Sequence, residues 1–540
     1  MTTVTAKPRR FQNAGKLVPS MGWKAWAAHH AWVAPVVMLA AWLRFTGIGN
    51  HFLFGDEAEY AIVARYLSHD WTYLAYPAIE GLGATPFVSQ PPLLLYLMAL
   101  SIRIFGASDL AALLPSLVLG TATVLVVYAI GHRLGGRFMG LSAAFVLAVL
   151  PFHVEITRKA MLDAGYTFFL ALTAYFLVAW LQTRSRRHAL GVGIAVACAA
   201  LSKLPGMLAG PVVLLVFAYA LGLTLAKRDW PSAREMGVQA GIGLAPVLAG
   251  ALLYVGLLTY LQAVQNLWMK LSWQFGRVSG GGATTELGAV ARPISFYFTD
   301  PKFGFVTLFG GVILMVVVLG VAVAAYRWLR RPERAVAHVV PLAFSAVLLA
   351  FFLFSQRKEG FYLLPFAPFF ALFIAYAADG LRTLGSYAGS PVSSLRPRVS
   401  AAATALAIVL VAAPAYVSAT SSYHQFGLGQ APDRFFGSGT KEAAAWIHSH
   451  DPDAGQYGTL LGRFTLYYYN EQTTYHWYVD HTLIEQKVRE GKLKYVVYDE
   501  YLGVSFDGDY MKELISKYHG TQVVRYHQGW GNVWVYELHP

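Results

Sequence analysis

The chain contains little cysteine and few charged residues, and both features limit the class of protein to which it can belong. Its single cysteine, Cys198, lies in an apolar run, which excludes a disulfide framework and a cysteine-based metal site. Charged residues make up 13% of the 540 residues and hydrophobic residues 56%, and the mean hydropathy is +0.46. Several apolar runs approach the roughly 20 residues needed to cross a bilayer. The composition therefore predicts a polytopic α-helical membrane protein.

Two other sequence signals are also missing. No glycine-rich nucleotide-binding signature follows a predicted strand, and the chain has no visible internal repeat. The formal net charge of +13 would suggest a nucleic-acid partner in a soluble protein. In a membrane protein the position of each basic residue along the loops matters more, so we expect no nucleic-acid partner.

The apolar runs predict about eleven membrane spans, within an expected range of about 11–13 transmembrane helices. The spans cover residues 31–48, 109–131, 138–153, 164–182, 189–202, 206–225, 236–260, 303–326, 336–355, 361–380 and 399–417. The run PPLLLYLMALSIRIF (91–105) is short for a span, so it predicts a juxtamembrane or re-entrant helix.

Basic segments predict the orientation, because cytoplasmic loops carry an excess of Lys and Arg. Such segments alternate correctly with the spans if 91–105 does not cross. They are the N-terminal tail 1–30, GHRLGGR (131–137), QTRSRRH (182–188), AKRDWPSAR (226–234), YRWLRRPER (326–334) and the loop 382–398. The tail is interpreted as a retained cytoplasmic segment, because the first apolar run lacks a small-residue cleavage site.

This orientation places several polar segments together on the non-cytoplasmic side. They are the first outer loop 49–108 and the segments 153–163, 202–206, 261–302 and 355–360. Within the long 261–302 loop, RVSGGGATTE (277–286) is typical of a mobile segment. Residues 31–418 form the predicted membrane domain.

Composition changes to polar and aromatic near Ser418, and residues 419–540 predict a small extracytoplasmic α/β domain. Helices are expected at KEAAAWIHSH (441–450) and DYMKELISKYH (509–519), and a strand at KYVVYDE (494–500). The segment TQVVRYHQGWGNVWVYEL (521–538) predicts a hairpin that turns near residues 529–532.

The first outer loop carries FLFGDEAEYAIVARYL, which starts at Phe52 and opens a helical pattern. Asp56 either caps this helix or acts as a catalytic carboxylate, and the two roles are compatible. Glu57 and Glu59 favour the positive end of the helix.

A second acid, Asp163, ends the segment HVEITRKAMLD at the start of a span. One interpretation is a local ion pair with Arg158 or Lys159, which lie near helical spacing from it. The other pairs Asp163 with Asp56 across one site, as a base, as an acceptor-orienting group or as metal ligands.

Three cations, Lys203, Arg357 and Lys358, lie beside spans on the same predicted side. Each could simply extend to lipid headgroups. Together they could instead hold an anionic headgroup, because guanidinium and ammonium groups bind phosphate. Tyr362 follows in RKEGFYLLP and fits an aromatic belt or a site wall. A substrate with a phosphate, a lipid tail and a polar reacting group suits these residues, and so does the substrate of an anion transporter.

Four stretches occur in a fixed order over about residues 30–210: FGDEAEYAIVARYL, SQPPLLLYLMALSIRIFG, LLPSLVLGTATVLVVYAIGHRLGG and ITRKAMLD. They resemble the GT-C superfamily of glycosyltransferases that use polyprenyl-phosphate sugars. The similarity is greatest to the bacterial aminoarabinose transferases of lipid A and the relatives of protein O-mannosyltransferases. RKEGFYLLPFAPF resembles a later feature of that family.

The resemblance implies an inverting transferase. Asp56 matches the essential first-loop carboxylate of the family, and Asp163 matches its second acid. Lys203 and either Arg357 or Lys358 match positions that meet the lipid phosphate in relatives. Asp56 would orient or deprotonate an acceptor hydroxyl while polyprenyl phosphate departs.

One position departs from the family pattern. Aminoarabinose transferases carry an acid-lysine-proline stretch where this chain has Ser89-Gln90-Pro91. Gln90 brings no charge, so a lipid A acceptor is less favoured. The expected substrate-binding residues are Glu57, Tyr60, Gln90, Arg158, Lys159, Lys203, Arg357, Lys358 and Tyr362.

The resemblance also admits a divalent metal ion, for which Asp56, Asp163, His153 and Glu155 are the candidate ligands. The expected partners are a polyprenyl-phosphate-linked sugar, membrane lipids and a lipid, glycan or protein acceptor. We expect a monomer in the bacterial inner membrane with its site on the periplasmic or extracellular side. Two alternatives are a flippase or transporter of lipid-linked sugars and a scaffold that presents the C-terminal domain.

Overall fold

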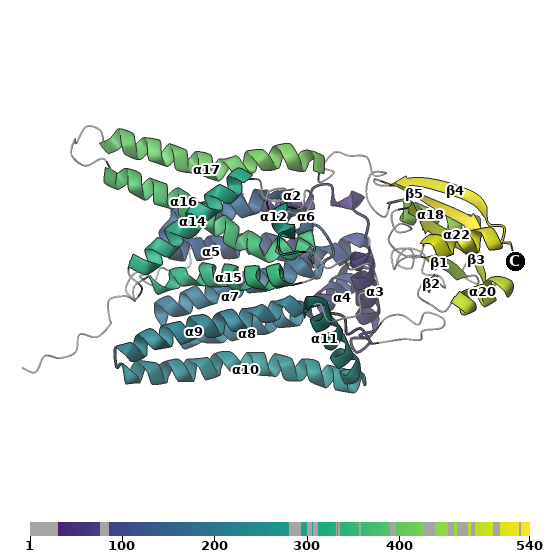
Figure 1. Cartoon of the computed structure of the whole chain (residues 1–540), viewed down its shortest axis with the longest axis horizontal. Helices are drawn as coiled ribbons and strands as arrows, with labels where there is room; N and C mark the ends of the chain where they lie inside the picture. Colours follow the sequence, from purple (N-terminus) through teal and green to yellow (C-terminus); the bar gives the residue numbers. More distant parts are fainter. Residues whose placement is uncertain are drawn as a thin grey trace, which may run out of the picture.

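The computed structural model describes most of the chain. The described residues are 31–53, 55–75, 86–279, 293–299, 305, 311–330, 332, 335–355, 358–388, 396–425, 438–451, 458–461, 474–476, 481–500, 508–528 and 531–539. Figure 1 shows a bundle of long helices with a small α/β domain beyond one of its ends. The fold class predicted from the sequence is therefore confirmed.

Long helices run side by side through the bundle (Figure 1). They are α2 (Ala34–Phe45), α5 (Asp109–Val149), α7 (Leu162–Thr183), α8 (Arg186–Ser202), α9 (Ala209–Ala226), α10 (Trp230–Tyr260), α14 (Gly311–Arg330), α15 (Val339–Phe354), α16 (Ala367–Ala388) and α17 (Arg396–Gln425). Among the described residues, 7 helices are long and apolar enough to cross a membrane, and shorter apolar helices occupy Ala31–Phe45, Leu93–Phe105 and Val399–Ala413. The chain is a multi-pass membrane protein.

Two of the predicted spans, 109–131 and 138–153, lie in the 41-residue α5. The helix breaks at Gly136, where φ is 81°. Nine residues of continuous helix would separate Gly131 from Gly140 by about 13 Å, yet a Cβ on Gly131 would lie 2.9 Å from the Cα of Gly140. The chain therefore reverses here, as the basic GHRLGGR segment predicts. The boundary at 153 is wrong, because α5 ends at Val149 and Pro151 starts α6 (Pro151–Thr157).

Shorter elements gather at the end of the bundle that faces the small domain, here called the domain end (Figure 1). They include α3 (Asp56–His69), α4 (Leu93–Phe105), η3 (Leu204–Leu208) and η5 (Gly360–Phe366). Helix α4 confirms the helix expected at 91–105. Its 13 residues are too few to cross the apolar core of a bilayer.

The prediction of a long loop at 261–302 is wrong in part. Helix α11 (Val264–Ser279) follows α10 directly, and α12 (Phe296–Thr299) lies near the end of this segment. Helix α11 exposes Trp268 and Met269, but polar residues such as Asn266 and Lys270 flank its apolar ones, so it lacks the continuous apolar run used to find spans. Most of the stretch expected to be mobile, 277–286, lies outside the described residues.

The C-terminal domain contains a mixed sheet with the strand order β2-β1-β3-β5-β4. Its strands are β1 (Gly458–Leu461), β2 (Thr474–His476), β3 (Leu493–Asp499), β4 (Thr521–Gln528) and β5 (Gly531–Glu537), and its helices are α18 (Ser438–His450), α20 (His481–Arg489) and α22 (Gly508–Lys517). Strands β4 and β5 pair antiparallel, as the predicted hairpin requires. The sequence analysis missed α20, β1 and β2.

Alternation along β3 buries both faces of this sheet. Val496 and Tyr498 join an apolar cluster with α20 and α22, whereas Tyr495 and Val497 join a cluster with α18 on the opposite face. Successive side chains of a strand point to opposite faces, so a central strand covered on both sides is apolar at nearly every position.

The small domain contacts the membrane part through α18. Lys441 forms an ion pair with Asp109, the first residue of α5, at 3.1 Å. The same ammonium lies 5.0 Å from the ring centroid of Phe52, in the segment that leads to α3. The domain is therefore anchored beside the loop that carries Asp56.

Close backbone contact between α8 and α10 gives the first prediction. A Cβ on Gly193 would fall on the carbonyl oxygen of Gly243, so we expect Gly193→Ala to lower the free energy of unfolding by about 1–3 kcal/mol. Gly241, on the same α10, has no heavy atom within 4 Å of such a Cβ. Gly241→Ala is the matched control and should be neutral or slightly stabilising. Equal unfolding of both variants in detergent would contradict the contact.

Candidate functional site

Helix ends bring the predicted site residues together at the domain end. The N-terminus of α7 carries Asp163, the residue after α8 is Lys203, and η5 carries Phe361 and Tyr362. Acids are stabilised at helix N-termini and cations at helix C-termini, so each charge lies where its helix favours it.

A buried ion pair forms the centre of this site. Lys203 Nζ donates to Asp163 Oδ2 at 2.7 Å, and the two side chains are 8% and 0% exposed. Three rings surround the ammonium: its nitrogen lies 5.3 Å from the ring centroid of Phe361, 5.8 Å from that of Tyr362 and 5.9 Å from that of Tyr166. Aromatic faces attract cations. The expected local pairing of Asp163 with Arg158 or Lys159 is wrong, because Lys203 takes that place.

Asp163 retains one free acceptor in the described part of the chain. Its Oδ1 is buried and has no hydrogen-bond partner among the described residues. Buried polar atoms are rarely left unsatisfied, which makes Oδ1 a candidate acceptor for a substrate group.

Asp56 is the exposed acid of the site. Gly55, with φ of 59°, is the N-cap residue of α3, and Asp56 is the first helical residue. The interpretation of Asp56 as the helix cap is therefore wrong. An exposed carboxylate at the first turn of a helix is held by its backbone and remains available to solvent and substrate.

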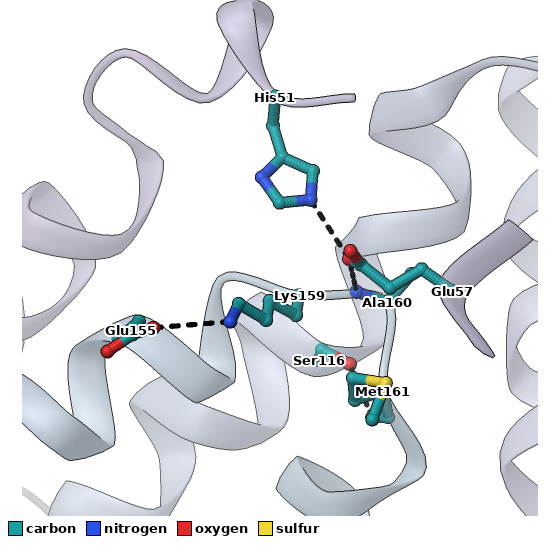
Figure 2. Close-up of polar contacts among 7 residues, drawn as sticks. All are labelled: His51, Glu57, Ser116, Glu155, Lys159, Ala160 and Met161. Carbon is teal, nitrogen blue, oxygen red and sulfur yellow. Dashed lines mark hydrogen bonds and ion pairs between the residues drawn. The ribbon is translucent and has the colours of Figure 1, made fainter. Parts of the chain in front are cut away.

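Glu57 points away from solvent and into the protein. Figure 2 shows its Oε1 between the ring of His51 and the backbone nitrogen of Ala160, at 2.9 Å and 2.7 Å. The adjacent carbonyl of Met161 accepts from the hydroxyl of Ser116 at 3.0 Å. Side chains from α3 and α5 therefore satisfy the backbone of the turn between α6 and α7.

Arg158 and Lys159 also have partners within the protein. Arg158 Nη1 donates to the carbonyl oxygens of Leu43, Arg44 and Thr46 at 2.8, 3.1 and 2.8 Å. Lys159 pairs with Glu155 at 3.2 Å, and both of these side chains are partly exposed. Arg158 thus binds the C-terminal end of α2.

The candidate metal ligands do not assemble into one site. His153 is fully buried, and its Nδ1 accepts from Arg44 at 2.6 Å, so this nitrogen carries no proton and its lone pair is occupied. Glu155 is paired with Lys159. Within the described ranges, no group of three or more His, Cys, Asp or Glu side chains could hold a metal ion.

The other predicted substrate-binding residues occupy different environments. Gln90 Oε1 accepts from the backbone nitrogen of Leu204 at 3.3 Å, directly beside Lys203. Tyr60 is buried and packs edge-on against Phe87 at a centroid distance of 6.2 Å, so it belongs to the apolar core below Asp56.

Lys358 is a second buried cation of the site region. Its ammonium donates to the carbonyl oxygen of Ser355, and burial lowers the pKa of Lys358. The other predicted cation of this segment, Arg357, lies outside the described residues.

Sequence reasoning identified Tyr362 but missed two other tyrosines of this region, Tyr166 and Tyr297. Tyr166 lies one helical turn after Asp163, at the spacing that places both on one face of α7. Its ring centroid lies 5.9 Å from the ammonium nitrogen of Lys203. The spacing of Tyr166 was readable, but Tyr297 comes from a distant segment, where its hydroxyl donates to the carbonyl of Glu359 at 3.1 Å.

Comparison with known proteins identifies the fold and one family segment. Residues 89–254 match the family model described as dolichyl-phosphate-mannose-protein mannosyltransferase, which includes Gln90, Asp163 and Lys203. This chain is similar in structure to ArnT from Cupriavidus metallidurans, whose crystal structure was determined with bound undecaprenyl phosphate. The match covers 94% of this chain and 98% of the ArnT chain, with a TM-score of 0.62 and 16% sequence identity. The chain has the GT-C fold. The resemblance predicted from the ordered motifs is confirmed.

Two further relatives are similar over different lengths. The match to the archaeal oligosaccharyltransferase AglB from Archaeoglobus fulgidus covers 92% of this chain and 73% of the AglB chain, with a TM-score of 0.60 and 16% sequence identity. A polyprenol-phosphate-mannose–protein mannosyltransferase of Corynebacterium glutamicum is 29% identical over 172 residues. That match spans 31% of this chain and 33% of the relative.

The buried ion pair predicts a strong energetic coupling. Lys203→Met leaves Asp163 buried without its cation, which should lower the free energy of unfolding by about 3–5 kcal/mol. The double variant with Asp163→Asn should recover much of that loss. Denaturation in a fixed detergent measures the cycle. Glu155→Ala, which breaks a partly exposed pair, is the control and should cost at most about 1 kcal/mol. Additive effects of the two site substitutions would contradict direct pairing.

Proposed function

We propose that this protein transfers mannose from a polyprenyl-phosphate donor to a hydroxyl group of an acceptor at the non-cytoplasmic face of a bacterial plasma membrane. The observation that carries the proposal is the buried Asp163–Lys203 pair together with the exposed carboxylate of Asp56, whose neighbour Glu57 is hydrogen-bonded to Ala160 in the turn before Asp163. The mannosyltransferase family match over residues 89–254 supports this assignment and the choice of mannose.

Cations at the domain end suit the leaving group. Lys203 and Lys358 are both buried, and charges in a low-dielectric site act more strongly on a phosphate than charges in water. In the complex with the donor, the ammonium of Lys203 would bind the phosphate as well as Asp163, and its interaction with Asp163 would weaken. Fixed donors aimed at developing negative charge lower the barrier to departure.

Asp56 would act on the acceptor. In the proposed reaction, the acceptor oxygen attacks the anomeric carbon while the bond from that carbon to the phosphate oxygen breaks. The bonding electrons leave with polyprenyl phosphate, the hydroxyl proton passes to Asp56, and the configuration at the anomeric carbon is inverted. An exposed acid beside the buried cations satisfies this division of roles.

We infer a protein acceptor. The Corynebacterium glutamicum relative is a protein mannosyltransferase by name. The position of the small domain is compatible with a large acceptor, since Lys441 holds α18 beside Phe52 in the loop before Asp56. A protein hydroxyl, unlike a phosphate acceptor, needs the base that Asp56 supplies.

Metal dependence stays a prediction. Asp56 and Asp163 remain candidate ligands, whereas His153 and Glu155 are engaged by Arg44 and Lys159. The residues present do not fit a preassembled site, so no step is assigned to a metal.

The proposal predicts a large loss of transfer in Asp56→Asn. Wild type and variant would be placed in liposomes with radiolabelled polyprenyl-phosphate mannose and a cell-envelope protein extract. We expect a decrease of about 10²–10⁴-fold, because the variant lacks the general base. Asp70→Asn, at the other end of α3, is the control: Asp70 is exposed and accepts from Thr72, and transfer should be unchanged.

Three outcomes separate the proposal from its rivals. Equal transfer by wild type and Asp56→Asn at equal thermal stability would remove Asp56 from the reaction. Transfer of another sugar, but not mannose, would overturn the choice of donor. Movement of the lipid-linked sugar across the bilayer without transfer would favour a flippase.

A further inference from the structure

The candidate acids belong to two segments that are distant in sequence. Asp56 lies in the segment 43–57, whereas Asp163 follows the turn 158–161 between α6 and α7. Side-chain hydrogen bonds join these segments at two places, and each bond ends on a backbone atom of the opposite segment.

The first connection uses Arg158. Its Nη1 donates to the carbonyl oxygens of Leu43, Arg44 and Thr46, which lie at the C-terminal end of α2. These carbonyls have no further helical turn to bond to, and they carry the negative end of the helix dipole. A guanidinium group therefore fixes the exit of α2 against the start of the turn.

The second connection uses Glu57, the neighbour of Asp56. One oxygen, Oε1, accepts both from His51 Nε2 and from the backbone nitrogen of Ala160 (Figure 2). In this arrangement His51 is the donor in the tautomer that carries its proton on Nε2. Glu57 is 6% exposed and Ala160 is fully buried, so loss of this acceptor would leave a buried amide without its partner.

We infer that Glu57 is a positioning residue whose single oxygen atom, rather than its negative charge, sets the separation of Asp56 from the Asp163–Lys203 pair. The inference replaces the substrate contact predicted for Glu57. Its oxygen is engaged inside the protein, while the neighbouring Asp56 is exposed. Ala160 lies three residues before Asp163, so a shift of Ala160 would also shift the start of α7.

The inference predicts an unusual order of activities, and this part of the test rests on the proposed function. Glu57→Gln keeps an oxygen at the same reach and should retain transfer. Glu57→Asp keeps the charge, but its side chain is shorter by one methylene and its oxygen cannot reach Ala160. Glu57→Ala removes the carboxylate. Both should lose about 100-fold in kcat, the cost of a displacement near 1 Å. Asp70→Asn, at the other end of α3, is the control and should transfer like wild type.

A second measurement does not require activity. Hydrogen exchange of the amide of Ala160, followed by mass spectrometry of the segment around 158–162, reports whether the second connection is present. Protection should persist in Glu57→Gln and decrease in Glu57→Asp and Glu57→Ala. Exchange in α8, which lacks this connection, is the internal reference.

The outcomes distinguish failure of the inference from failure of the proposed function. If Glu57→Gln keeps the amide protected but transfers as poorly as Glu57→Ala, the charge itself is needed and Glu57 is a catalytic residue. Unchanged protection in Glu57→Asp and Glu57→Ala would also overturn the inference. If wild type transfers no sugar, the proposed function fails, and the exchange pattern alone decides the positioning role. If Glu57→Ala does not fold, Glu57→Asp decides.

Discussion

A carboxylate and an ammonium group that share one buried place constrain the rest of this site. Removing both charges from water costs several kcal/mol, so interactions with the surrounding groups must compensate for that free energy. Asp163 lies at the positive end of α7, Lys203 at the negative end of α8, and three aromatic rings surround the ammonium. This requirement fixes where two helices end relative to each other and where η5 must pack. Asp56 can remain exposed because it does not share the pair.

Much of the fold could be predicted from the sequence, because long apolar runs report membrane spans directly. The turn at GHRLGGR was readable from its charges, and the strands β3, β4 and β5 from their apolar patterns. Helix α11 was missed since an interfacial helix alternates apolar and polar residues and does not form a continuous run. The short strands β1 and β2 each contain at most four residues, too few for a reliable pattern.

The site was predictable as a set of residues but not as a set of pairs. Asp163 and Lys203 were identified by their positions beside spans, yet Arg158 is much closer to Asp163 in sequence than Lys203 is. Only the packing of α7 against α8 decides between these partners. The contact of Glu57 was unreadable for a different reason. Its partner at Ala160 is a backbone N–H group, which every residue type but proline carries.

Helix α4 can cover only part of the depth of a bilayer. Its 13 residues extend about 20 Å, and it exposes Leu100, Ile104 and Phe105. The hydrocarbon core of a bilayer is ~30 Å thick, so these exposed side chains can meet acyl chains over only a part of that thickness.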